Sequence, residues 1–205
     1  MRVAGSDIKV VEGLIALNGV VFIMSMANQE MVFQNMGMSF SSFFIKPWTI
    51  ITSMFVHAGF HHILWNMIGL FMFSMYLERL IGEKILLKIY MIGGICGGLL
   101  YLFTAMIGLA HPNTIVVGAS GAIFALGATL AVLRPNIQIY LFPIPFPMPL
   151  YVAVFFFMVV MSFQPGVAWA GHFGGLAAGV YFGFQLKKQT PEYQIITPYG
   201  RTRYY

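Results

Sequence analysis

The chain has 205 residues, of which 59% are hydrophobic and 8% are charged, and its mean hydropathy is +0.82. Because a soluble globular domain carries about a quarter charged residues, this composition excludes a soluble fold and indicates a protein that lies in lipid. At about 20 residues per span, the chain can hold several transmembrane helices in one bundle. Its single cysteine, Cys96, excludes an internal disulfide.

Apolar runs between charged residues predict the membrane helices. The fourth and fifth runs are short, which is typical of helices that begin or end inside the bilayer beside protein or a water-filled cavity. We therefore expect an all-α membrane protein, a bundle of six transmembrane helices formed by residues 1–187, followed by a polar, basic cytoplasmic tail at 188–205. The helices are predicted at residues 9–27, 61–79, 85–108, 119–133, 149–163 and 170–187.

The distribution of Lys and Arg predicts the orientation. With six helices, both termini lie on one side, together with ten of the eleven basic residues, and only Lys46 lies opposite. Because Lys and Arg collect in cytoplasmic loops, we expect a multi-pass protein with both termini in the cytoplasm, in a prokaryotic plasma membrane. The net charge of +5 then reflects orientation and contact with anionic lipid, and no nucleic-acid partner is expected.

An alternative interpretation of the first apolar run is a signal peptide. Residues 25–27, Ser-Met-Ala, have the small-x-small pattern of a cleavage site. Asp7 and Glu12 argue against it, because a signal peptide begins with a positively charged region. Removal of this helix would also leave an odd number of spans, so we expect a membrane helix here.

Three polar residues in the apolar spans mark candidate functional positions, because polar groups are costly inside a membrane. At about 1.5 Å per residue, Ser120, His172 and Asn66 each lie about 20–22 Å above the basic residue that ends their helix. In a hydrocarbon core of about 30 Å, they share a layer roughly 10 Å below the outer surface.

Small residues predict that two of these helices approach closely. The last predicted helix has glycine at every fourth position from 171 to 183, and the fourth helix is rich in glycine and alanine. We therefore expect His172 to reach Ser120, as a general base reaches a nucleophile. No carboxylate is expected beside them, so the pair would act as a dyad in which packing orients the histidine.

The surroundings of Ser120 predict an oxyanion site. Ser120 begins its helix after Gly118 and Ala119, where unpaired backbone N–H groups and the helix dipole stabilise negative charge. His62 and Asn66 are four residues apart on one helical face, so both side chains can donate hydrogen bonds to the same oxygen. We expect the Ser120 backbone N–H, His62 and Asn66 to hold the oxyanion.

Three segments, in this order, resemble the motifs of the rhomboid family of intramembrane serine proteases: HILWN at 62–66, GASGA at 118–122 and GHFGG at 171–175. The resemblance implies six helices, with Ser120 as nucleophile and His172 as general base and acid in a water-filled cavity that opens outward. It implies substrates that are single-span membrane proteins, cut near the outer end of their span. Phe124 stands where some members carry a tyrosine under the histidine ring, and it would support the site with Gly118 and Gly175.

The remaining histidines raise the question of a metal site, because His57, His61 and His62 are close in sequence. The chain lacks H-E-x-x-H, the ligand and general-base pattern of zinc proteases, so we expect no metal and no cofactor. His57 and His61 are expected at the outer interface. Two other functions stay open: a non-catalytic rhomboid-like protein that binds transmembrane segments, and a small transporter that uses the buried polar groups.

Overall fold

The computed structural model describes residues 9–140, 146–164, 166–187, 194–197 and 200–203. Each of the six predicted helices is present, with ends within two residues of the predicted positions. The all-α prediction is therefore confirmed. These helices are α1 (Lys9–Ala27), α5 (Phe60–Ile81), α6 (Glu83–Met106), α7 (Ser120–Leu133), α8 (Leu150–Ser162) and α9 (Trp169–Lys187).

The number of membrane spans stays a prediction. Among the described residues, two helices are long and apolar enough to cross a membrane on length and composition alone, at Val10–Ala27 and Glu83–Met106. Helices α7 and α8 are also apolar but shorter, with 14 and 13 residues.

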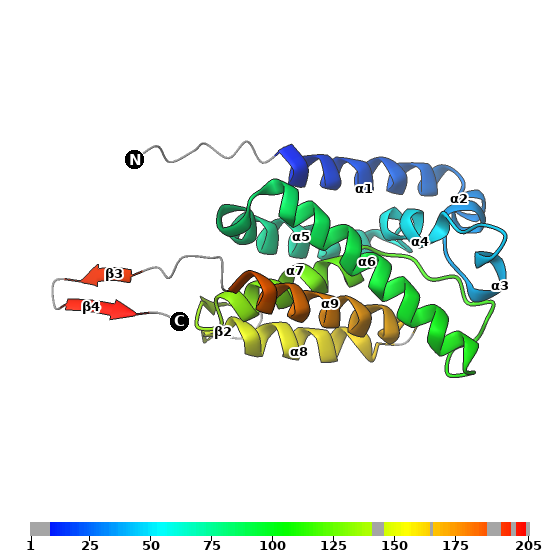
Figure 1. Cartoon of the computed structure of the whole chain (residues 1–205). Helices are drawn as coiled ribbons and strands as arrows, with labels where there is room; N and C mark the ends of the chain where they lie inside the picture. Colours follow the sequence, from blue (N-terminus) through cyan, green and yellow to red (C-terminus); the bar gives the residue numbers. More distant parts are fainter. Residues whose placement is uncertain (1–8, 141–145, 165, 188–193, 198–199, 204–205) are drawn as a thin grey trace.

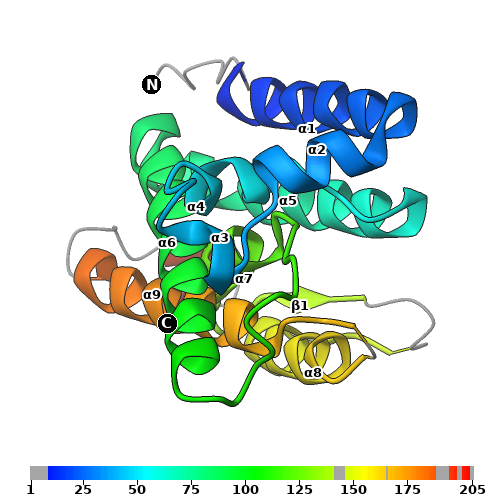
Figure 2. The same cartoon turned by 90° about the vertical axis from the view of Figure 1, so that its right-hand side faces the viewer.

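Helix α7 lies in the middle of the bundle. It packs against α5, α6, α8 and α9, and all its described residues from Ala122 to Ala131 are buried. Figure 1 shows that α1 begins and α9 ends at the same end of the bundle, and Figure 2 shows α1 and α8 on opposite sides of it. Ser120, the first residue of this central helix, is half-buried.

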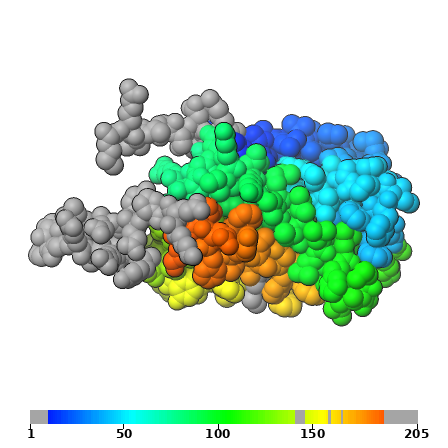
Figure 3. Space-filling model, viewed as in Figure 1, coloured from blue at the N-terminus to red at the C-terminus, as the bar shows by residue number. Residues whose placement is uncertain are grey.

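Residues 28–59 join α1 to α5 through short elements: α2 (Gln29–Met36), α3 (Phe40–Phe43), α4 (Thr49–Thr52) and the 3-10 helix η1 (Ser53–Phe55). Two of them have side-chain caps, because Asn28 accepts a hydrogen bond from the Met31 N–H and Ser39 accepts one from the Ser42 N–H. In Figure 3 this segment, in light blue and cyan, covers one end of the molecule. It lies over the end at which α7 begins.

The described strands are short. Strand β1 (Gln138–Ile139) pairs antiparallel with β2 (Met148–Pro149) before α8. Strand β3 (Gln194–Thr197) pairs antiparallel with β4 (Gly200–Arg203), in the region predicted as a polar tail.

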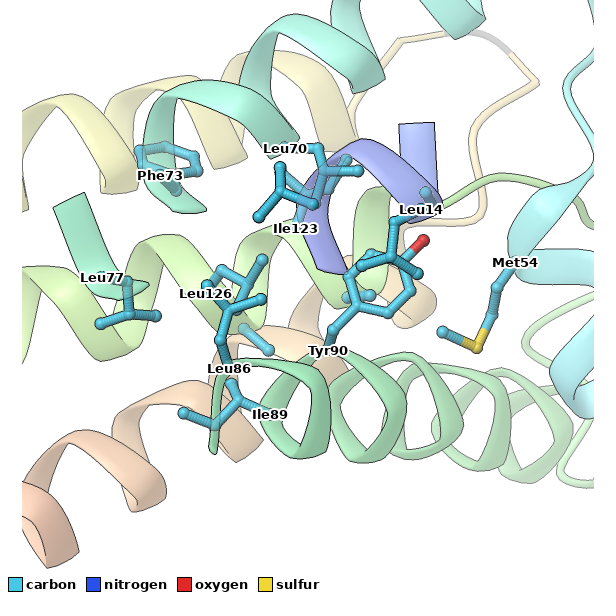
Figure 4. Close-up of a cluster of buried hydrophobic side chains, with 14 of the residues drawn as sticks. Leu14, Met54, Leu70, Phe73, Leu77, Leu86, Ile89, Tyr90, Ile123 and Leu126 are labelled. Carbon is cyan, nitrogen blue, oxygen red and sulfur yellow. The ribbon is translucent and has the colours of Figure 1, made fainter. Parts of the chain in front are cut away.

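The core contains a cluster of large apolar side chains and, between α7 and α9, close contacts of the two backbones. Figure 4 shows part of the buried cluster, which includes Tyr90 of α6 and Leu14 of α1. At the α7–α9 contact, a Cβ added to Gly175, Gly179 or Gly183 would overlap Gly121, Ala125 or Val132, respectively. The glycine face predicted for α9 is confirmed at these three positions.

The prediction for Gly171 is wrong in one respect. A Cβ added at this position would meet nothing within 4 Å, so its missing side chain is not what allows close approach. Its carbonyl oxygen instead lies 2.5 Å from the position that a Cβ on Gly97 would take and 3.0 Å from that of a Cβ on Gly121, too close for either. The required glycines are therefore on the partner helices.

Candidate active site

The segment before α7 is fixed by backbone hydrogen bonds. Met38 and Val116 exchange N–H to carbonyl bonds of 3.1 and 2.8 Å, and the Gly118 N–H donates to the Ser53 carbonyl at 2.9 Å. Gly118 has a φ of +126°, a conformation that favours glycine. The chain thus turns at Gly118 and places Ser120 at the N-terminus of α7, where the first N–H groups have no partner within the helix.

The structure brings Ser120 and His172 together. The Nε2 atom of His172 lies 2.8 Å from the Ser120 Oγ, a hydrogen-bond distance between groups 52 residues apart. His172 is 7% exposed and belongs to α9, whose glycine face allows the approach. This is the arrangement of a serine nucleophile and its general base.

Two further side chains hold the His172 ring. The Phe124 ring lies against it, with ring centres 4.8 Å apart at 48°, as expected for stacking support. On the opposite ring nitrogen, Nδ1 lies 2.9 Å from the Oγ of Ser162, the last residue of α8. The expectation that packing alone orients the histidine is therefore incomplete, because a hydroxyl also bonds to it.

His62 lies beside Gly118, at the turn that leads to Ser120. A Cβ added to Gly118 would lie 2.8 Å from both Cε1 and Nε2 of His62, and 3.8 Å from the Ser120 Oγ. The Ala58 N–H donates to His62 Nδ1 at 3.3 Å. Because Nδ1 accepts, the hydrogen of the neutral ring lies on Nε2, so the atom beside Gly118 is a donor.

Asn66 is buried one turn after His62, and its amide is directed to its own helix. Its Nδ2 donates to the His62 carbonyl at 2.7 Å, and its Oδ1 has no partner among the described residues. The described hydrogen bonds do not join Asn66 to Ser120. A second hydrogen on Nδ2 stays free to donate.

His57 is buried within the fold, which its sequence context did not predict. It is 1% exposed, and its ring packs edge-on against His62 with centres 5.0 Å apart. Its expected depth at the outer interface stays a prediction. Burial, with a smaller contribution from the nearby His62, lowers the pKa of His57 to about 4. His61 is exposed. Among the described residues, no group of three or more His, Cys, Asp or Glu is arranged to hold a metal ion.

Comparison with known families agrees with the motifs around this site. A sequence model of the Rhomboid domain matches residues 45–189, which is more than half of the chain. The chain belongs to the rhomboid family. As a rhomboid-family member, it is an integral membrane protein of a family that includes intramembrane proteases.

Several curated rhomboid proteins are similar to the chain. RHOMBOID-like protein 5 of Arabidopsis thaliana is 36% identical over 154 residues, 75% of this chain and 48% of that protein. The mitochondrial RHOMBOID-like protein 12 of the same plant is 31% identical over 201 residues, 89% of this chain and 60% of that protein. YdcA of Bacillus subtilis, named as a candidate rhomboid protease, is 32% identical over 146 residues, 67% of this chain and 66% of that protein.

The relatives bear on two expectations, the activity of the chain and the membrane in which it lies. This rhomboid chain spans 48%, 60% and 66% of the length of the three relatives, so their activities as whole proteins are not carried over. The mitochondrial location of one relative conflicts with the expected prokaryotic plasma membrane. Membrane integration is shared by the family, whereas the host membrane stays open.

Proposed function

We propose that this rhomboid-family chain is an intramembrane serine endopeptidase that works by a Ser120–His172 dyad. The observation that carries the proposal is the 2.8 Å contact between Ser120 Oγ and His172 Nε2 at the start of the central helix. The family adds support, since it includes proteases. Residues 1–187 would form the protease core, with both termini and the tail at 188–205 in the cytoplasm.

The residues divide the reaction between them. Ser120 Oγ attacks the carbonyl carbon of the scissile peptide bond while His172 Nε2 takes the hydroxyl proton. His172 then returns this proton to the leaving amine, and water from an outward-facing cavity hydrolyses the acyl-enzyme with His172 again as the base. No metal or cofactor takes part in these steps.

The negative charge on the substrate oxygen needs donors close to Ser120. The first N–H groups of α7, including that of Ser120, have no partner within the helix and lie at its positive end. The Nε2–H of His62 lies beside Gly118, and the free amide hydrogen of Asn66 lies one turn further along α5. We assign the Ser120 N–H, His62 and Asn66 as the hydrogen-bond donors to the oxyanion. The position of His62 beside Gly118 supports its role better than the position of Asn66 supports that of Asn66.

The proposed substrates are single-span membrane proteins, cut within or near the outer end of their span. This assignment rests on the rhomboid resemblance and on the predicted position of Ser120, about 10 Å below the outer surface. Lipid and the transmembrane substrate would be the partners of the protein.

The test is cleavage of a single-span reporter protein in liposomes that contain the purified chain. We expect cleavage by the wild type and none by Ser120→Ala. Ser74→Ala is the matched control, because Ser74 is a buried serine of α5 whose hydroxyl has no partner among the described residues. Cleavage by Ser120→Ala at the wild-type rate would contradict the proposal.

A further inference from the structure

The catalytic histidine of the proposed dyad is held at both ring nitrogens. Nε2 lies 2.8 Å from Ser120 Oγ on α7, and Nδ1 lies 2.9 Å from Ser162 Oγ at the end of α8. Ser162 is 2% exposed, whereas its neighbour Phe163 is 71% exposed. The serine is therefore the inward-pointing residue at this end of α8, and its hydroxyl bonds to the imidazole.

The two nitrogens of a neutral imidazole have opposite roles, since one carries the hydrogen and the other the lone pair. To take a proton from Ser120, Nε2 must carry the lone pair, so the hydrogen must lie on Nδ1. The Ser162 oxygen is placed to accept this hydrogen. The hydrogen bond at one nitrogen sets which nitrogen is protonated, and in serine proteases with a triad an aspartate does this.

No carboxylate takes that position here, because the described residues provide no Asp or Glu that bonds to His172. We propose that Ser162 is a positioning residue that holds His172 as the Nδ1–H tautomer with Nε2 directed at Ser120. The inference rests on the proposed function, because the tautomer matters only if Nε2 acts as the base.

The hydrogen bond between His172 and Ser162 becomes stronger during the reaction. When Nε2 takes the Ser120 proton, the ring becomes a cation, and the Nδ1–H bond to Ser162 becomes a charge-assisted bond, which is stronger than a neutral one. Ser162 keeps its own proton throughout and forms no covalent bond. Its effect is therefore on the rate at which His172 takes the proton, and Ser162 itself does not react with the substrate.

The first test measures the rate at which a fluorophosphonate reacts with Ser120 in the purified full-length protein. Ser162→Ala should react about tenfold to a hundredfold more slowly, because it leaves a buried donor without an acceptor. Ser162→Thr keeps a hydroxyl and should recover most of the rate. Ser25→Ala is the matched control, since the buried Ser25 hydroxyl donates to the Val21 carbonyl within α1, and it should react as the wild type does.

Two results of this test would overturn the inference. One is an unchanged rate in Ser162→Ala. The other is an equal loss of rate in Ser162→Ala and Ser162→Thr, since it would make packing, and not the hydroxyl, the cause.

The second test observes the tautomer itself and does not depend on activity. In protein labelled with 15N-histidine, the His172 signals are assigned by their absence in His172→Ala. We expect a protonated Nδ1 and an unprotonated Nε2 in the wild type at neutral pH, and a mixture of tautomers in Ser162→Ala. The same tautomer in both proteins would contradict the role of Ser162, whereas a wild type that never labels at Ser120 would contradict the proposed protease activity instead.

Discussion

Gly175 of α9 lies directly against Gly121 of α7, so close that a Cβ at position 175 would overlap the Gly121 carbonyl oxygen. Gly121 follows Ser120 in the sequence, and Gly175 is three residues after His172. The backbone contact and the 2.8 Å contact between Ser120 Oγ and His172 Nε2 therefore belong to the same part of the helix pair. The short distance between Ser120 and His172 therefore depends on having glycine at both position 121 and position 175.

Gly175→Ala should separate α9 from α7. Overpacking of this kind costs about 1–3 kcal/mol of stability, and because the obstacle is backbone, the helices must shift. We expect a lower unfolding temperature in detergent and a loss of reporter cleavage. Gly13→Ala is the matched control, because a Cβ at this α1 position meets nothing within 4 Å. Cleavage by Gly175→Ala at the wild-type rate would contradict the packing argument.

Gly118→Ala tests the position of His62. The new Cβ would lie 2.8 Å from the His62 ring, which must move away from the start of α7. Because loss of one oxyanion donor costs about a hundredfold or more in rate, we expect a fall of that order in the cleavage rate. Gly108→Ala separates this effect from backbone strain, since Gly108 also has a positive φ, +79°, but a Cβ there meets nothing within 4 Å. A similar loss of cleavage rate in both variants would show that backbone strain, and not displacement of His62, is the cause.

Phe124 should act on the rate through His172. Phe124→Leu keeps an apolar side chain but loses the ring contact, which is worth about 0.5–1.5 kcal/mol, so we expect fluorophosphonate labelling to slow by a few fold. Phe73→Leu is the control, because Phe73 is a similarly buried phenylalanine, 8% exposed against 6% for Phe124, that packs near Gly127 instead. If Phe73→Leu slowed labelling as much as Phe124→Leu does, the cause would be a general loss of packing and not the contact with His172.

The positions of the helices could be predicted because apolar runs end at charged residues or loops. The approach of His172 to Ser120 could be predicted from equal depth and from the glycines of α9. Depth and glycine spacing can both be counted along the sequence of each helix. Neither requires knowing how the helix is rotated about its axis.

Ser162 and His57 were missed because their roles depend on tertiary packing. Helix α8 is apolar on nearly all sides, so its sequence does not reveal which face turns inward, and Ser162 resembles a packing residue. It is nevertheless a polar residue at the end of an apolar run, and that signal could have marked it. His57 lies in a short loop between η1 and α5, whose burial against His62 arises only in the fold. The short helices α2 to α4 likewise have too few turns to give a periodic pattern.

His57 predicts a dependence of stability on pH. Its pKa is about 4 in the folded protein, below the ordinary value of 6.5, because burial disfavours the charged ring and His62 adds to this. Between these two values the unfolded chain binds a proton that the folded chain does not, so acidification favours unfolding. We expect the unfolding temperature to fall from pH 7 to pH 5.

His57→Phe should reduce this fall, because it keeps a buried ring that cannot be protonated. His61→Phe is the control at an exposed histidine of the same region and should leave the fall unchanged. An equal fall in the wild type and in His57→Phe would show that His57 is not the group responsible.

The central claim, that Ser120 is a nucleophile activated by His172, is tested most directly by fluorophosphonate labelling of the purified protein, with the modified residue located by mass spectrometry. We expect one label per chain on Ser120 in the wild type, none in Ser120→Ala, and very slow labelling in His172→Ala. Labelling of Ser120→Ala to the wild-type extent, or of His172→Ala at the wild-type rate, would contradict the account.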